Sequence, residues 1–269
     1  MKQTVTTYCG AKTPVFAPLF SEKMTETYRI ADTVIEICSL HERVHRLCAA
    51  YRTAGDPADL HVRITQADID DERARSCCEK QLTGLTAIAR TDGYIEELAV
   101  YRKIAEEMPF HDVVLMHGSC VAVDGEGYLF TAKSGTGKST HTRLWRELLG
   151  DRAVMINDDK PLIRITENGA TIYGTPWCGK HRLGTNCSVP LKAICVLKRA
   201  EQNEIHRIQA AEAFPILMQQ IYRPDDNAAM MQTLSLTQTL AGAVDLWQLG
   251  CNMELEAAEI AYRAMKSSD

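Results

Sequence analysis

The feature that most limits how this chain can fold is a glycine-rich run at residues 134–140, placed between an apolar segment and an amphipathic pattern. The run consists of Ser134, Gly135, Thr136, Gly137, Lys138, Ser139 and Thr140. Residues 128–130 before it are typical of a buried strand, and residues 144–149 after it put apolar side chains on one helical face. A strand, a glycine loop and a helix in this order are the context that a phosphate-binding loop requires. The sequence therefore predicts an α/β fold that carries such a loop.

Each residue type in the run has a physical use in binding phosphate. Glycines let successive main-chain N–H groups curl around phosphate oxygens, and the start of a helix adds the positive end of its dipole. We expect Lys138 to reach the β- and γ-phosphates and the Ser139 hydroxyl to join a Mg²⁺ shell. Ala132 stands where the usual G-x-x-x-x-G-K-[ST] pattern has its first glycine. We expect this alanine to be tolerated if its φ angle is negative.

Two adjacent carboxylates follow the next predicted strand. Residues 154–156 form an apolar run, and Asp158 and Asp159 come just after it. Because successive side chains of a regular strand point to opposite faces, the backbone must turn at Asp158 for both carboxylates to face the loop. In phosphoryl transfer, one carboxylate would hold Mg²⁺ and the other would orient or deprotonate the acceptor hydroxyl. A solvated acidic turn before Pro161 is the alternative interpretation.

Three further groups are candidates for the site. His117 stands at the end of a predicted strand, where it is either an active-site residue or a core histidine. Lys180, His181 and Arg182 follow a turn and could clamp a phosphate or an anionic acceptor, although a solvated basic loop fits the pattern equally well. Trp177 is either a packing surface for a substrate or, as its type favours, a core aromatic.

The chain resembles the HPr kinase/phosphorylase family at three places that agree in order and spacing: His117-Gly118, residues 134–139 and Asp158-Asp159. The resemblance implies the distinctive P-loop class that this family shares with the phosphoenolpyruvate carboxykinases, and phosphorylation of a hydroxyl. It also implies that Asp158 acts as the base and Asp159 as a magnesium ligand. His117 would then lie close to both and shape the charge around the transferred phosphoryl group.

The resemblance extends from about residue 113 to about residue 199. The shorter HPr kinase-like proteins of uncertain substrate look closer than HPr kinase itself, since they share the stretches Gly174-Thr175-Pro176-Trp177 and Pro190-Leu191. The later catalytic arginine and the C-terminal signature of the family are not identifiable in this chain. The resemblance therefore does not extend to HPr as the acceptor or to the reverse phosphorylase reaction.

We expect an α/β fold: a P-loop kinase core of the HPr kinase/PEP carboxykinase type, with a mixed sheet flanked by helices, and a smaller N-terminal α+β region. In that region, residues 34–37 and 60–64 have strand patterns. Residues 66–91 are charged and weakly patterned, as in a link or a solvated helix. We therefore divide the chain into an N-terminal region of unknown function, residues 1–90, and a catalytic domain, residues 91–269.

Within the second part, periodicity and turn residues predict a series of elements. They are a helix over 94–108, strands at 113–116, 121–123, 154–156 and 191–197, a hairpin over 162–173, and a mostly helical remainder that ends on a helix containing 255–262.

Composition argues against several classes of protein. The net charge of -5 gives no electrostatic reason to expect a nucleic-acid or anionic-membrane partner. Neither the N-terminus nor any later run has the apolar length of a signal peptide or a membrane span, so we expect a cytoplasmic protein whose ten cysteines are thiols. Cys178, His181, Cys187 and Cys195 form the one group that could indicate zinc, and no Cys-x-x-Cys pair anchors it.

These patterns predict a kinase that uses ATP and Mg²⁺ to phosphorylate a hydroxyl of a protein, peptide or small molecule. Two alternatives stay open. One is a nucleotide-binding regulatory module without phosphotransfer activity, and the other is a carboxykinase-type enzyme acting on a keto acid. The sequence does not identify the acceptor, and it leaves the formation of a homo-oligomer open.

Overall fold

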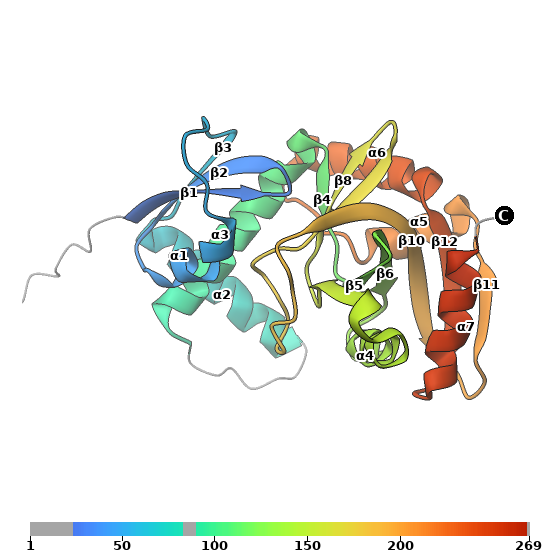
Figure 1. Ribbon diagram of the computed structural model, residues 1–269. Coiled ribbons are helices and arrows are strands. Elements are labelled where there is room, and N and C mark those ends of the chain that lie inside the picture. The colour runs from blue at the N-terminus through green and yellow to red at the C-terminus, as the bar shows by residue number, and fades with distance from the viewer. Residues whose placement is uncertain (1–23, 83–89, 268–269) are drawn as a thin grey trace, which may run out of the picture.

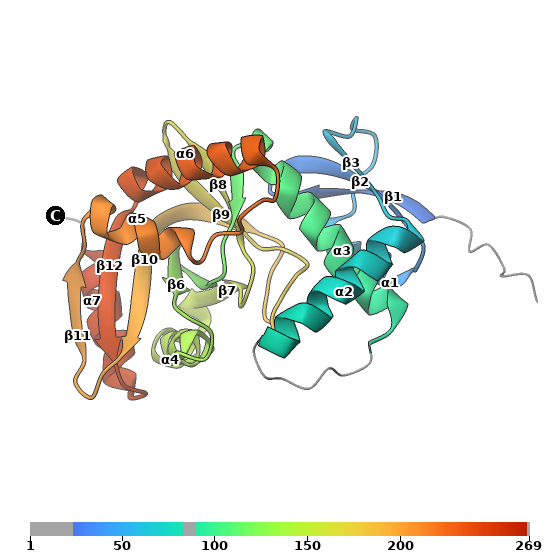
Figure 2. The ribbon, with the colours of Figure 1, turned by 180° about the vertical axis from the view of Figure 1, so that it is seen from behind.

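The computed structural model describes residues 24–82 and 90–267 of the chain and contains two β-sheets (Figure 1). The first sheet has the order β1-β2-β3, with β1 (Met24–Ile30) antiparallel to β2 (Thr33–Ser39) and β2 parallel to β3 (Leu60–Arg63). Three helices accompany it: α1 (Arg43–Leu47), α2 (Gln66–Leu82) and α3 (Asp92–Glu107). Figure 2 shows α2 beside α3, and we call this assembly the N-terminal unit.

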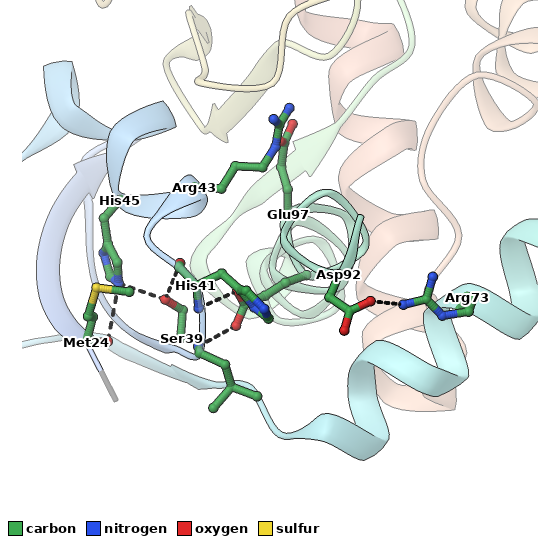
Figure 3. A network of polar contacts seen from close by, with 10 residues as sticks. Met24, Ser39, His41, Arg43, His45, Arg73, Asp92 and Glu97 are labelled. Atoms are coloured by element: carbon green, nitrogen blue, oxygen red, sulfur yellow. Dashed lines mark hydrogen bonds and ion pairs between the residues drawn. The ribbon is translucent and has the colours of Figure 1, made fainter. Parts of the chain in front are cut away.

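A buried carboxylate ties the chain between β2 and α1 to helix α3. Glu96 on α3 is fully buried, and its carboxylate accepts hydrogen bonds from the main-chain N–H groups of Leu40 at 2.5 Å and His41 at 2.9 Å. Next to it, the buried His45 ring contacts the Ser39 hydroxyl at 2.8 Å (Figure 3). Hydrogen bonds of this kind are costly to break because they leave buried polar groups unpaired. They hold α1 and the start of α3 in a fixed relation.

Helix α3 packs within the N-terminal unit, against α1, α2 and β3. Its buried face joins an apolar cluster that also contains Val113 and Leu115 from the first strand of the second sheet. The division of the chain at residues 90 and 91 stays a prediction, and the apolar core runs across it.

The second sheet is mixed and has nine strands in the described residues. Seven of them follow the order β4-β8-β9-β10-β6-β5-β7. Off this path, β12 pairs with β10, and β11 pairs with β12. Strand β10 is parallel to β6 and β12, while the remaining neighbours are antiparallel. The strands are β4 (Val113–Leu115), β5 (Ser119–Val123), β6 (Glu126–Thr131), β7 (Ala153–Asn157), β8 (Leu162–Thr166), β9 (Gly169–Tyr173), β10 (Ser188–Arg199), β11 (Glu204–Arg207) and β12 (Asp245–Cys251).

Helices cover both faces of this sheet. On one face, α4 (Lys138–Leu149) and α7 (Leu255–Lys266) pack against the side chains of 193, 195 and 197 on β10 (Figure 1). On the other, α5 (Ala210–Met218) and α6 (Asn227–Ala243) pack against the intervening residues 194 and 196 (Figure 2). This alternation is what a strand buried on both faces requires. The expected α/β class, a mixed sheet flanked by helices with a smaller α+β region, is confirmed.

The C-terminal part differs from the sequence expectation in one respect. Helices α5, α6 and α7 agree with the mostly helical pattern, but β11 and β12 were not predicted. Strand β12 follows α6 after a single residue, and its hydrogen bonds come from β10 and β11, which are distant in the sequence. None of the helices within residues 24–82 and 90–267 combines the length and apolar character needed to cross a bilayer.

A buried histidine makes the packing of α4 sensitive to pH. His141 lies in the first turns of α4 and is 2% exposed, and its Nε2 accepts a hydrogen bond from Trp145 Nε1 at 3.1 Å. In the described part of the chain, no group pairs with His141 Nδ1. Burial lowers the pKa of His141 from 6.5 to about 4, because the charged imidazolium would lose its hydration.

We expect His141 to destabilise the protein progressively as the pH falls from 6.5 towards 4, by up to about 3 kcal/mol. The sign follows because the unfolded chain binds a proton on this residue at a higher pH than the folded chain does. Urea unfolding at pH 7 and pH 4.5 measures the effect, with His141→Gln as the comparison. Equal pH dependence of wild type and variant would contradict this prediction.

Candidate active site

The glycine-rich run connects β6 to α4 and has the backbone that its glycines allow. Gly135 has φ 78° and Gly137 has φ 128°, a region that other residues rarely adopt. No described atom lies within 4 Å of a Cβ built at either position, so these glycines serve the backbone conformation and not close packing. Ala132 is buried and keeps φ outside the left-handed region, so the expectation that alanine is tolerated there is confirmed.

Lys138 is the first residue of α4 and is largely buried. Its Nζ donates a hydrogen bond to the main-chain oxygen of Ala132 at 3.0 Å, so the ammonium folds back over the loop. Burial lowers the pKa of Lys138, and the negative charge of Asp159 opposes this effect. The lysine and the second aspartate are thus electrostatically linked.

Arg199 braces the outside of the loop and was not singled out as a site residue from the sequence. It stands at the end of β10, and its guanidinium donates to the main-chain oxygens of Thr136, at 3.3 Å, and Gly135. These contacts join the end of β10 to the loop.

Asn157 turns the chain so that the two aspartates leave the sheet together. It is the last residue of β7 and is fully buried. Its Oδ1 accepts hydrogen bonds from the main-chain N–H groups of Asp159 at 2.8 Å and Lys160 at 2.7 Å. Its Nδ2 donates to the Thr175 hydroxyl at 3.0 Å. The turn expected at Asp158 is present, and the side chain of Asn157 closes it in the manner of an Asx-turn.

The two aspartates are held by different groups. Asp158 is 7% exposed, and its Oδ1 accepts a hydrogen bond from the main-chain N–H of Gly179 at 2.6 Å. A Cβ at Gly179 would lie 3.1 Å from Asp158 Oδ2 and would press on the carboxylate. The main-chain oxygen of Asp159 accepts from the N–H of Gly118 at 3.0 Å, which joins the His117-Gly118 segment to the acidic pair.

His117 lies beside Asp159, with 3.6 Å between its Nε2 and Asp159 Oδ1. Its Nδ1 is 3.3 Å from the side-chain oxygen of Gln220, and its main-chain N–H donates to the Gln220 main-chain oxygen at 2.7 Å. Burial lowers the pKa of His117, the charge of Lys138 lowers it further, and Asp159 opposes both. The neutral imidazole is therefore favoured at this position.

The loop, the acidic pair and His117 surround one cavity of about 780 Å³. This volume is in the range of pockets that enclose small-molecule ligands. The sequence-predicted residues that line it are His117, Ser134, Gly135, Gly137, Lys138, Ser139, Thr140, Asp158, Asp159, Lys180 and His181. Thr136 instead faces Arg199 through its main-chain oxygen, and Arg182 lines a neighbouring cavity together with Lys180.

The cavity offers oxygen ligands that suit Mg²⁺. The Ser139 hydroxyl and the Asp159 carboxylate both line it, and Mg²⁺ commonly takes one or two protein oxygens, with phosphates and water completing its shell. Among the residues that the structure describes, no group of three or more His, Cys, Asp and Glu side chains could hold a metal ion by itself. The group proposed from the sequence as a zinc alternative is separated, because Cys195 and Cys187 pack on opposite faces of the sheet.

Trp177 is 5% exposed and packs against the ring of Tyr101, with 5.6 Å between the ring centroids. It belongs to the apolar cluster of the N-terminal unit, in agreement with its interpretation as a core aromatic. Its exposed edge lines the neighbouring cavity.

Fold and site define an α/β protein in which a glycine-rich loop and an acidic pair line one cavity. A family model described as SynChlorMet cassette protein ScmC matches residues 95–240, more than half of the chain, and the chain therefore belongs to this family. No curated protein matches it. Among solved structures, the HPr(Ser) kinase/phosphatase from Coxiella burnetii is similar with a TM-score of 0.32 and 9% identity, over 57% of this chain and 99% of that chain. Residue roles are not transferred from a similarity at this level.

Proposed function

We propose that the protein is an ATP-dependent kinase that transfers the γ-phosphoryl group to a hydroxyl of a protein, peptide or small-molecule acceptor. The observation that carries this proposal is the shared cavity of the loop 134–140 and the pair Asp158 and Asp159. A glycine loop alone would suit any nucleotide-binding protein. A buried carboxylate directly opposite adds the group that transfer to a hydroxyl requires.

The loop would bind the phosphates of ATP with its main-chain N–H groups and the N-terminus of α4. The Lys138 ammonium would exchange its contact with the Ala132 oxygen for the β- and γ-phosphates. Ser139 and Asp159 would hold Mg²⁺, which, when bound, neutralises charge on the transferred phosphoryl group. A neutral His117 would leave the charge of Asp159 available to the metal.

Asp158 would orient the acceptor and take its proton. The N–H of Gly179 holds one carboxylate oxygen, which leaves the other for the acceptor hydroxyl. As the hydroxyl oxygen bonds to the γ-phosphorus, the bond from that phosphorus to the bridging oxygen breaks, the proton passes to Asp158, and ADP is released. Such a transition state is loose, so most of the rate enhancement comes from positioning and charge neutralisation.

The proposal is tested by following label from ATP into a host extract of metabolites and proteins. With γ-labelled ATP and Mg²⁺, we expect label to move to an acceptor, whereas α-labelled ATP should transfer none. ATP binding by calorimetry without transfer of either label would contradict a kinase and favour the nucleotide-binding regulatory module.

Replacing Asn157 with alanine should lower phosphotransfer by about a hundredfold and change ATP affinity by less than about threefold. The described hydrogen bonds of the Asn157 side chain involve neither the loop 134–140 nor Lys138. Without this side chain, the N–H groups of Asp159 and Lys160 lose their acceptor, and we expect the acidic pair to shift. Single-turnover kinetics and calorimetry measure the two effects. Asn203→Ala, which removes an amide near β11, is the control. An equal loss of ATP binding and transfer would show general unfolding and would contradict the positioning role.

A further inference from the structure

A second cavity, of about 630 Å³, adjoins the first on the side of the N-terminal unit. The two cavities share the lining residues Asp159, Gly179 and Lys180, so they meet beside the acidic pair. Helix α1, the start of α3 and the loop 174–186 form the walls of the second cavity. A molecule bound there would lie next to Asp159 and Gly179, and a part of it that extends into the first cavity would reach Asp158.

Basic side chains dominate the lining of the second cavity. The charged residues are Arg43, Arg90, Lys160, Lys180 and Arg182, against Glu97 and Asp159. Arg43 is paired with Glu97, with 2.6 Å between Nε and Oε2. Within the described ranges, the other four cations form no ion pair with a carboxylate. The cavity lining therefore has an excess of positive charge, which suits an anionic ligand.

Two of these cations rest on aromatic rings. Lys160 Nζ lies 4.2 Å from the ring centroid of Tyr101, and Arg90 Cζ lies 4.1 Å from that of Tyr94. A cation–π contact at an exposed site is weaker than a charge-assisted hydrogen bond to an anion. The rings thus hold the cations at the cavity without competing strongly with an anionic ligand.

Arg182 occupies a backbone position that favours glycine. Its φ is 50°, and its main-chain N–H donates to the Gly179 oxygen at 3.0 Å to close a turn. A left-handed conformation is unfavourable for a residue with a Cβ. Strain of this kind is found where a side chain has a use, and here the side chain lines the second cavity.

Apolar side chains also line the second cavity, beside the polar residues Thr175 and Asn186. Tyr51 and Trp177 are largely buried at its base, and Leu47, Tyr94 and Leu98 add half-exposed apolar surface. Its volume is that of a small-molecule pocket. A matching ligand has a compact body with an apolar or planar part and carries a negative charge.

We propose that the second cavity binds the phosphate acceptor, and that this acceptor is a low-molecular-weight hydroxyl compound carrying a carboxylate or phosphate group. The inference rests on the proposed kinase function. The acceptor hydroxyl lies at Asp158, and its anionic group contacts Lys160, Lys180 and Arg182. The γ-phosphoryl group passes to the hydroxyl oxygen, the proton passes to Asp158, and ADP leaves.

Matched pairs of acids and neutral analogues test the inference by calorimetry on protein saturated with Mg²⁺ and a non-hydrolysable ATP analogue. The pairs are N-acetylserine and its amide, D-glycerate and its amide, 3-hydroxybenzoate and its amide, glycerol 3-phosphate and glycerol, and the peptide Gly-Ser-Gly as acid and amide. At least one anion should bind about tenfold or more tightly than its neutral partner. The pair with the largest difference in affinity between acid and neutral partner shows whether the cavity prefers a carboxylate or a phosphate, and a metabolite or a peptide.

In the same titrations, Lys160→Gln and Arg182→Gln should each weaken the preferred anion by about tenfold and leave its neutral partner within about twofold. Arg263→Gln, the same change of charge on α7, should leave both unchanged. Equal affinity for acids and neutral partners, or no binding of any pair while the ATP analogue binds, would overturn the inference. Failure of the wild type to bind the ATP analogue would contradict the proposed function itself, and the inference with it.

Discussion

Replacing Lys138 with alanine should lower kcat/KM for phosphotransfer by about a thousandfold or more. The variant loses a buried cation at the loop, whose Nζ lies 3.0 Å from the Ala132 oxygen. Without it, negative charge that builds up between the β- and γ-phosphates has no protein partner at that point. Turnover of γ-labelled ATP measures the loss, and calorimetry with a non-hydrolysable analogue should show weaker binding as well.

Lys133→Ala is the matched control for this experiment. Lys133 belongs to the same loop and is exposed, but it is not among the described residues that line the cavity. We expect this variant to transfer phosphate at close to the wild-type rate. Undiminished transfer by Lys138→Ala, or an equal loss in both variants, would contradict the role assigned to Lys138.

Replacing Asp158 with asparagine should lower phosphotransfer by about 10² to 10⁴ and spare ATP binding. The amide has the shape of the carboxylate and an oxygen that can still accept the hydrogen bond from the Gly179 N–H. It cannot accept the proton of the acceptor hydroxyl. Single-turnover rates at saturating ATP measure the first effect, and calorimetry measures the second.

The neighbouring aspartate separates the two acidic roles. Asp159→Asn should raise the Mg²⁺ concentration needed for half-maximal activity, because Asp159 is the carboxylate proposed to hold the metal, whereas Asp158→Asn should not. Asp124→Asn, at the exposed turn between β5 and β6, controls for loss of charge. An identical dependence of the two site variants on Mg²⁺ concentration would contradict the assignment of metal binding to Asp159 alone.

The centre of the site was predictable because its signals are local. Strand β6, the loop and α4 follow one another directly, and each has its own pattern of apolar residues or glycines. Asp158 and Asp159 come directly after a readable strand, β7. The proximity of the loop and the acidic pair, which the strand pattern led us to expect, follows from the order β6-β5-β7 in the sheet.

The residues that hold these groups in place were not found from the sequence. Gln220 contacts His117 from 103 positions away, and Arg199 reaches Thr136 from 63 positions away. Contacts between such distant residues exist only once the sheet has formed, and no local pattern marks them. Asn157 is different, because asparagine at the end of a strand is a known turn former and its role could have been predicted. The sequence interpretation assigned the site to the two aspartates beside it instead.

Local sequence patterns also did not predict that side chains of the N-terminal unit lie at the site. The first 90 residues contain no motif, and their function was left open. In the structure, Arg43 and Leu47 of α1 and Tyr94 of α3 line a cavity beside the acidic pair. A single apolar cluster joins this unit to β4 and β8, and it brings those side chains to the site.

A crystal structure with Mg²⁺ and a non-hydrolysable ATP analogue tests the central claim most directly. We predict that the β- and γ-phosphates accept hydrogen bonds from the main-chain N–H groups of residues 135–139, with the metal between the Ser139 hydroxyl and the Asp159 carboxylate. Asp158 should face the γ-phosphate within the same cavity. Phosphates bound away from this loop, or aspartates turned away from them, would contradict the assignment.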